Sequence, residues 1–268
     1  MSMSWKLGRF AGIDVYLHPT FLLILFMPAV LQGGPIGLAL VLAVFGCVLL
    51  HEYGHALMAR RFGIETADIT LYPIGGVARL MRLPRSPGAE LLIALAGPAV
   101  NVAIAAGLAA LGIVGIWEPE GLLGWFAFEL MVVNLLLAAF NLIPAFPMDG
   151  GRVLRAILSG WVGRLEATRL AAGLGRGLAV LFGVYSLING PWTWLVLAVF
   201  VYFAAGAERS RVEFEEARRR NETFHPFAGD QEIWVAPPGY HWVRRGTNGW
   251  QLAPVTVTTH SGASHRWR

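Results

Sequence analysis

The stretch IGLALVLAVFGCVLLHEYGHALMARR, which runs from Ile36 to Arg61, decides the fold. Its first part, Ile36–Leu50, carries no charge, and its last part ends in two arginines shortly before Gly63. Arginines in the last turn and a following glycine are typical of a helix C-terminus, and about 20 mostly apolar residues cross a bilayer. The pattern therefore predicts a membrane-spanning helix with two histidines and a glutamate near one end.

The composition of the whole chain also indicates a membrane protein. Of the 268 residues, 56% are apolar and 14% are charged, whereas about a quarter of the residues of a soluble domain are charged. The nearly uncharged runs are Phe21–Leu31, Ile36–Leu50, Leu91–Trp117, Leu122–Phe146, Leu178–Leu187 and Trp192–Ala207. They predict an all-α polytopic membrane protein with about six transmembrane helices, some of them tilted or short. The segment before the first run is too long and mixed for a cationic leader, so that run is expected to stay in the mature chain.

Basic residues avoid every second connection between these runs. Gln32–Pro35, Glu118–Gly121 and Asn189–Pro191 contain no Lys or Arg, and the basic residues fall in the other connections and in the two terminal segments. Positive charge marks the cytoplasmic face, so we expect a multi-pass protein of the cell membrane with both termini in the cytoplasm. This rule and a basic tail account for the net charge of +4, so nucleic acid is not expected as a partner.

Two short segments have strand-like patterns. Residues 65–83 place apolar and β-branched side chains on both sides of the turn Pro73–Gly76, which predicts a small membrane-associated β-hairpin. The segment Trp5–Leu17 alternates loosely around Gly8 and Gly12, and a second short hairpin is expected there.

The histidine motif predicts a metal site. His51 and His55 are four residues apart, so on a helix they lie about 40° apart in azimuth and one turn apart in height, and both imidazoles can reach one metal ion. Glu52 lies beside the first ligand, where its carboxylate can accept a proton from water at the metal. Ionisable clusters at membrane depth are costly and are functional by default. Cys47, one turn before His51, is expected to be a small buried residue.

A catalytic zinc needs a third protein ligand and an open position. Asp149 is the best candidate, because the helix Leu122–Ile143 breaks at Pro144–Pro147 and returns the chain to the end of the histidine helix. Asp14 and Glu90 are the other acidic residues considered, and both are expected to be surface or capping groups. An ordinary Asp-Gly turn at Asp149 remains an alternative.

Two further motifs give the chain a family resemblance. It resembles the site-2 proteases, which pair His-Glu-x-x-His with a later Asn-x-x-Pro-x-x-Pro-x-Asp-Gly, found here as NLIPAFPMDG in Asn141–Gly150. The element GPAVN in Gly97–Asn101 and the stretch Pro73–Arg79 also look like family features. The resemblance implies one zinc ion held by His51, His55 and Asp149, with Glu52 as general base and Asn141 stabilising the tetrahedral intermediate. Asn101 would support the site or bond helix to helix.

The resemblance also implies a function. It covers about Leu7–Ala207, without a PDZ-like insertion or CBS modules, and implies hydrolysis of peptide bonds in or near transmembrane segments of membrane-protein substrates within the lipid bilayer. Residues 1–207 are expected to form the transmembrane metalloprotease domain, and residues 208–268 a cytoplasmic helix with a tail that is either a small hairpin or disordered. The alternatives are a zincin with a downstream glutamate ligand, and an inactive scaffold that binds metal or membrane helices. Glu52 argues against the scaffold, because metal binding alone requires no base.

Overall fold

The structure is a computed structural model, and it describes residues 4–26, 28–73, 75–82, 84, 86–118, 120–190, 192–223, 236, 239–245 and 249–255. The chain separates into two compact units, Met1–Ala217 and Arg218–Arg268. The first unit contains the histidine motif and nearly all of the helices.

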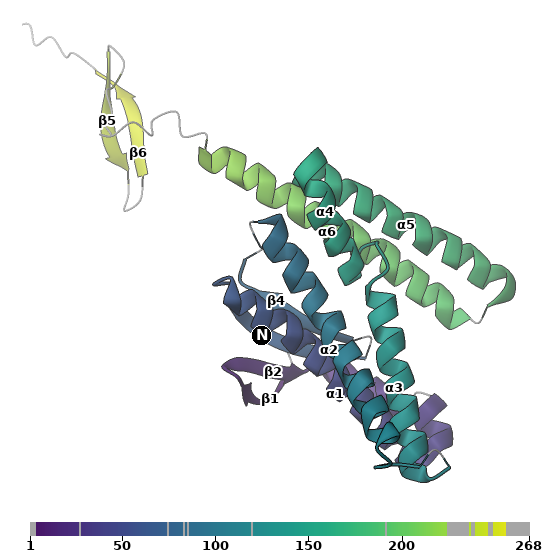
Figure 1. The fold of residues 1–268 in the computed structure, drawn as a ribbon. Coiled ribbons are helices and arrows are strands. Elements are labelled where there is room, and N and C mark those ends of the chain that lie inside the picture. Colours follow the sequence, from purple (N-terminus) through teal and green to yellow (C-terminus); the bar gives the residue numbers. More distant parts are fainter. Residues whose placement is uncertain are drawn as a thin grey trace, which may run out of the picture. The chain divides into compact units, whose positions relative to one another are not determined.

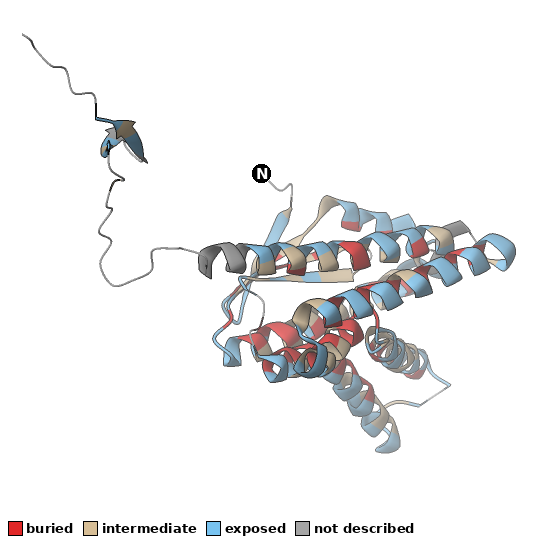
Figure 2. Ribbon diagram, turned by 90° about the horizontal axis from the view of Figure 1, so that it is seen from above, coloured by how far each residue is buried: buried red, intermediate tan, exposed pale blue. Residues whose placement is uncertain are grey.

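Six α-helices and one 3₁₀ helix make up most of the described part of the first unit. They are η1 (Pro19–Phe26), α1 (Pro28–Arg61), α2 (Pro87–Ile113), α3 (Leu122–Asn141), α4 (Asp149–Val162), α5 (Arg164–Asn189) and α6 (Trp192–Thr223). The helices α1, α2 and α3 lie side by side, and α5 and α6 form a helical hairpin that follows the short α4 (Figure 1). Figure 2 shows buried residues along the faces where the helices meet and exposed residues along their outer faces.

The helices identify an integral membrane protein. Among the described residues, four helical segments are long and apolar enough to cross a bilayer: Val30–Arg61, Pro87–Ile113, Leu122–Asn141 and Arg164–Asn189. Large apolar side chains also cover outer surfaces outside these four, such as Phe203, which is 69% exposed. The mostly helical class predicted from the sequence is confirmed. Of the six or so predicted spans, the described residues provide four candidates.

The first apolar run does not form a regular α-helix. Its described residues lie in η1 and in the first turns of α1, and α1 itself is interrupted at Gly34, whose backbone is non-helical with φ of 56°. Only glycine adopts this φ without strain, and Pro35 cannot donate a helical hydrogen bond to the preceding turn. The turn predicted at Gln32–Pro35 is therefore a kink between two helical segments.

The two predicted hairpins exist, but they form one sheet. The strands β1 (Trp5–Phe10), β2 (Ile13–Leu17), β3 (Thr66–Tyr72) and β4 (Gly75–Leu80) lie in the order β1-β2-β3-β4. Parallel pairing of β2 with β3 joins the hairpins and sets Val15 opposite Ile69, both of them fully buried. Because β4 is an edge strand, one side of its backbone is open for further pairing.

The helices approach one another closely at small residues. A Cβ atom at Gly54 of α1 would lie 2.6 Å from the carbonyl oxygen of Ala96 in α2. Alanines such as Ala59, Ala94 and Ala138 are almost completely buried between helices. Without a strong hydrophobic driving force between helices in lipid, such small residues allow backbone contact and dispersion attraction.

A buried arginine holds α4 in place. Arg155 is 1% exposed and pairs with Glu90 of α2 and, at 3.1 Å, with Glu208 of α6. Its guanidinium also lies over the Phe146 ring, 4.9 Å from the centroid. Glu90, expected to be a surface or capping group, is instead buried and paired.

The second unit contains a β-hairpin. The strands β5 (Tyr240–Arg245) and β6 (Gly249–Pro254) pair in antiparallel fashion, with Trp242 opposite Leu252. The hairpin alternative for the tail therefore applies to these residues, while residues 224–235, 237–238, 246–248 and 256–268 lie outside the described residues. The predicted boundary between residues 207 and 208 falls within α6, and the division into domains stays a prediction.

Candidate metal centre

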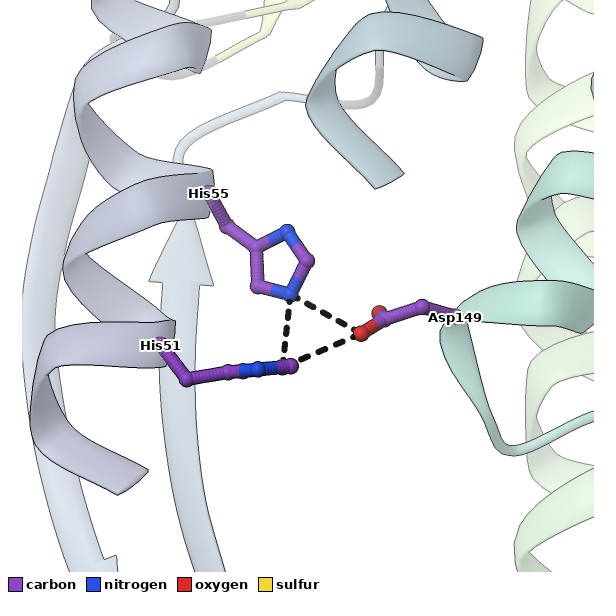
Figure 3. Close-up of side chains that lie close together, drawn as sticks. All are labelled: His51, His55 and Asp149. Atoms are coloured by element: carbon purple, nitrogen blue, oxygen red, sulfur yellow. Dashed lines mark hydrogen bonds and ion pairs between the residues drawn. The ribbon is translucent and has the colours of Figure 1, made fainter. Parts of the chain in front are cut away.

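Three side chains converge at the end of α1, as Figure 3 shows. The Nε2 atoms of His51 and His55 lie 3.1 Å apart, and they lie 3.1 Å and 3.0 Å, respectively, from Oδ2 of Asp149. All three residues are buried, and in the described part of the chain they form a group that could hold a metal ion.

Local sequence explains how Asp149 reaches this position. The chain leaves α3 at Asn141, passes through the proline-rich loop and begins α4 at Asp149 itself. The next two glycines allow the new helix to lie directly on that loop. A Cβ at Gly150 would lie 2.2 Å from the Ile143 carbonyl oxygen, and one at Gly151 would lie 2.6 Å from the Phe146 nitrogen. The two glycines after Asp149 therefore allow the backbone to turn tightly back toward α1.

Hydrogen bonds fix the orientation of both imidazoles. His55 Nδ1 lies 2.7 Å from the Ile93 carbonyl oxygen, which can only accept, so Nδ1 carries the proton. His51 Nδ1 lies 2.5 Å from Oδ1 of Asn101 and donates to it. Neutral imidazoles with protonated Nδ1 have a lone pair on Nε2, so both lone pairs face Asp149.

The bond to His51 belongs to a longer chain of hydrogen bonds. Asn101 Nδ2 donates to Oδ1 of Asn134 at 2.9 Å, and Asn134 Nδ2 donates to the Leu130 carbonyl at 2.8 Å. Because a carbonyl can only accept, the direction of every bond in this chain is set, from Leu130 back to His51. Both asparagines are completely buried, and each completes the hydrogen bonding of the other.

Gly97 makes room for the ligand atoms. A Cβ atom at this position of α2 would lie 2.2 Å from Nε2 of His55 and 2.7 Å from Nε2 of His51. The imidazoles therefore lie against bare backbone, and any side chain at position 97 would displace them. The glycine of the GPAVN element has this steric role.

The donor set fits a metal ion. The two imidazole lone pairs and the carboxylate oxygen are all hydrogen-bond acceptors. Three acceptors this close together need a cation or a proton between them. Tetrahedral zinc ligands at about 2.0–2.1 Å from the metal lie roughly 3.3 Å from one another, and the three atoms here are 3.0–3.1 Å apart. Second bonds from each His Nδ1 are the usual support of a metal-binding imidazole.

Glu52 lies between the histidine helix and the sheet. Its Oε2 accepts a hydrogen bond from the backbone amide of Ala78 in β4 at 3.2 Å. A Cβ at Gly76 would lie 2.7 Å from the Glu52 Cγ, so that glycine leaves space for the side chain. Glu52 therefore contacts the edge strand, while the adjacent His51 belongs to the three-residue group.

The other predicted residues lie in different environments. Asn141, expected to stabilise an intermediate, is half-buried at the end of α3 and donates to the Leu137 carbonyl at 3.0 Å. Cys47 is buried, as expected. Asp14 pairs with Lys6 at 2.9 Å, away from the histidines. Asn134 was missed in the sequence, although an asparagine in the middle of an apolar helix is a signal of a buried polar contact.

Comparison with known proteins now places the chain in a family. The family model described as Peptidase family M50 matches residues 39–118 and 112–185, which together are more than half of the sequence. The chain belongs to peptidase family M50. It contains both motifs that indicated a site-2 protease, and that resemblance is confirmed.

Several relatives of this M50 chain carry names that include zinc. It is 38% identical over 219 residues to a zinc metalloprotease of Methanocaldococcus jannaschii, a match that covers 80% of this chain and 63% of the relative. It is 34% identical over 238 residues to the putative zinc metalloprotease Rip3 of Mycobacterium tuberculosis, covering 78% and 60%. The chain thus spans about three fifths of the length of these curated relatives. Both of these relatives are named as zinc metalloproteases.

A solved structure shares the fold. The chain matches a structure described as a site-2 protease from Methanocaldococcus jannaschii with a TM-score of 0.62 and 37% identity, covering 77% of this chain and 95% of that one. The M50 assignment therefore rests on both sequence and architecture.

Proposed function

We propose that this M50 chain is an intramembrane zinc endopeptidase that hydrolyses peptide bonds in or near transmembrane segments of other proteins. The observation that carries the proposal is the convergence of His51, His55 and Asp149 on one point, with Glu52 next in sequence to the first of them. A purely structural zinc site would be closed by four protein ligands, whereas three protein ligands leave a position open for reaction.

Each residue has a distinct role in this proposal. His51 and His55 would hold zinc through Nε2, and Asp149 through Oδ2. When bound there, zinc supplies Lewis-acid activation of water and of the scissile carbonyl. Glu52 takes the proton from the attacking water and delivers it to the leaving amine. Asn141 is proposed to stabilise the tetrahedral intermediate through its side-chain amide, which has two hydrogens and donates one of them to the Leu137 carbonyl.

The substrate must be extended before it can react. A peptide bond within a helix is shielded by its own hydrogen bonds, so we propose that substrates contain helix-weakening residues near the cut. The amide of Ala78 is directed away from β3, since its partner is Glu52, and in an antiparallel ladder every second residue faces outward. Gly76 and Ala78 therefore present an open edge, and an unwound segment would pair there by strand addition.

The proposed topology has six spans with both termini in the cytoplasm. The four apolar helices are joined by α6 and by η1 together with the start of α1, which supply the remaining two crossings. The distribution of arginines supports this orientation, because Arg60, Arg152 and Arg209 belong to connections on one predicted side. The metal-binding end of α1 would then open toward the cytoplasm of a cell-membrane protein, with residues 208–268 on the same side.

Replacement of Glu52 tests the function directly. The Glu52→Gln variant should retain zinc, measured as metal per chain, and should lose cleavage of a single-span substrate in detergent. An inactive scaffold predicts no cleavage by the wild-type chain either. Cleavage that persists in the purified variant would overturn the role of Glu52, and loss of zinc from Asp149→Ala but not from Glu90→Ala would separate this site from a glutamate-liganded zincin.

A further inference from the structure

A cleft lies between the edge strand β4 and the helices α2, α4 and α6. It is a small cleft that is partly open to solvent. One wall is apolar and includes Ala78 and Leu80 of β4. Elsewhere the lining contains three arginines, Arg152, Arg155 and Arg211, together with Glu90. None of the proposed metal ligands lines it.

The three arginines differ in how far their charges are compensated. Arg155 is fully buried, and Glu90 and Glu208 satisfy it from two sides. Arg152 is about one third exposed, and its one ion pair among the described residues is a long approach of 4.0 Å to Oδ1 of Asp149. Arg211 is exposed and has no ion pair within the described part of the chain. Glu208 also acts on Arg152 and Arg211 electrostatically, but in the described part of the chain neither guanidinium is held by a close ion pair as Arg155 is.

Zinc binding at the proposed metal site would increase the excess of positive charge in the cleft. Asp149 would be one of the residues that hold zinc, and its carboxylate would then compensate Arg152 less. A guanidinium in a partly dehydrated cleft pairs best with a carboxylate, which accepts two parallel hydrogen bonds. The wall formed by Ala78 and Leu80 fits the methylene groups of a short acidic side chain.

We propose that this cleft binds an acidic side chain of the substrate, aspartate or glutamate, on the cytoplasmic side of the scissile bond. The inference rests on the proposed protease function and adds a rule of specificity to it. The edge residue Ala78 both contacts Glu52 and lines the cleft. A peptide paired with β4 would therefore pass from the metal centre along the cleft, with alternate side chains directed toward Arg152 and Arg211.

A lipid headgroup has the same kind of charge but fits the surroundings less well. Lipids cover the outer faces of membrane helices, whereas one wall of this cleft is a β-strand with an open edge. Glu90 also lies in the lining, where its charge is already compensated by Arg155. An extended peptide thus accounts for both the apolar wall and the arginines.

The test compares substrates that differ by one charge. A single-span substrate series carries one glutamate, glutamine or lysine at successive positions on the cytoplasmic side of the cut, and kcat/KM is measured for the full chain in nanodiscs. We expect the glutamate substrate to be favoured over glutamine roughly fivefold at one or two positions, as a partly exposed ion pair allows. Arg211→Gln should remove the preference at the substrate position that faces Arg211, and Arg211→Glu should transfer it to the lysine substrate at that position.

A matched control comes from the same helix. Arg209 of α6 pairs with Glu213 at 2.9 Å and does not line the cleft, so Arg209→Gln should leave the glutamate-to-glutamine ratio unchanged. Equal cleavage of all three substrates by an active wild-type chain would overturn the inference while leaving the protease function intact. A rate that depends on anionic lipid content and on Arg211, but not on substrate charge, would assign the cleft to lipid and would also overturn it. Absence of wild-type cleavage would refute the proposed function itself.

Discussion

The Nδ1 atom of His51 lies 2.5 Å from the side-chain oxygen of Asn101, which fixes the imidazole with its Nε2 toward Asp149. Asn101→Ala would leave Nδ1–H without this acceptor in a dry environment. Loss of such a partner typically weakens metal binding roughly 10- to 100-fold. We expect that loss of zinc affinity in competition with a chromogenic chelator, carried out in the Glu52→Gln background to prevent self-cleavage. An unchanged affinity with reduced thermal stability would mean that Asn101 only bonds helix to helix.

Asn134 should affect zinc through Asn101. It accepts from Asn101 and donates to Leu130, so Asn134→Ala frees the Asn101 amide to rotate and present the wrong atom to His51. We expect roughly a tenfold loss of zinc affinity, the lower limit for an outer partner of a ligand. Asn134→Asp, which keeps the acceptor, should restore most of that affinity. If the two variants bind zinc equally weakly, acceptance from Asn101 is not the reason for the effect.

The sequence was sufficient to predict which three side chains converge at the proposed metal site, but not the hydrogen bonds that support them. His51 and His55 follow from helical spacing, and Asp149 from its place after a proline break. Asn134 lies 33 residues from Asn101 in an ordinary apolar run, and only the way α2 and α3 face each other brings the two together. The parallel pairing of β2 with β3 could not be predicted either, because the whole of α1 separates these strands in sequence. The buried partners of Arg155 also come from helices distant in sequence.

Gly97 offers a steric test of the site. Gly97→Ala places a methyl group within 2.2 Å of His55 Nε2, so the variant should lose most bound zinc, measured by metal analysis after gel filtration. Gly107 is the control, because it lies in the same helix and a Cβ there meets nothing within 4 Å. Gly107→Ala should bind zinc as the wild type does. Full zinc content in both variants would show that α2 does not press on the imidazoles.

Gly175 should matter for the loop that carries Asp149. A Cβ at Gly175 of α5 would lie 2.0 Å from the Phe146 carbonyl oxygen, whereas one at Gly177 would meet nothing within 4 Å. Gly175→Ala must displace the proline loop or α5, so both thermal stability and zinc content should fall, while Gly177→Ala should change neither. A loss of stability without a loss of zinc would show that the strain is absorbed by α5.

Arg155 provides a prediction for stability. Removing one member of a buried ion pair leaves the other charge unpaired and costs about 3–5 kcal/mol. Arg155→Ala should therefore unfold at a markedly lower temperature in detergent. Arg169, which pairs with Glu166 and Glu213 on the exposed surface, is the comparison, and Arg169→Ala should lower the melting temperature much less, because exposed ion pairs contribute little. Similar melting temperatures for the two variants would contradict the role of Arg155 in holding α4.

The hydrogen bond between Ala78 and Glu52 has a consequence for the order of events. A backbone amide has one hydrogen, and here Glu52 already holds it, at 3.2 Å. A peptide carbonyl that paired with β4 at this residue would compete for the same hydrogen, and the displaced carboxylate would become free to turn toward water. A peptide bound to the Ala78 amide and Glu52 bound to the same amide thus exclude each other. If Glu52 is the general base, as proposed, the sheet would hold it before a peptide arrives, and the arriving peptide would release it.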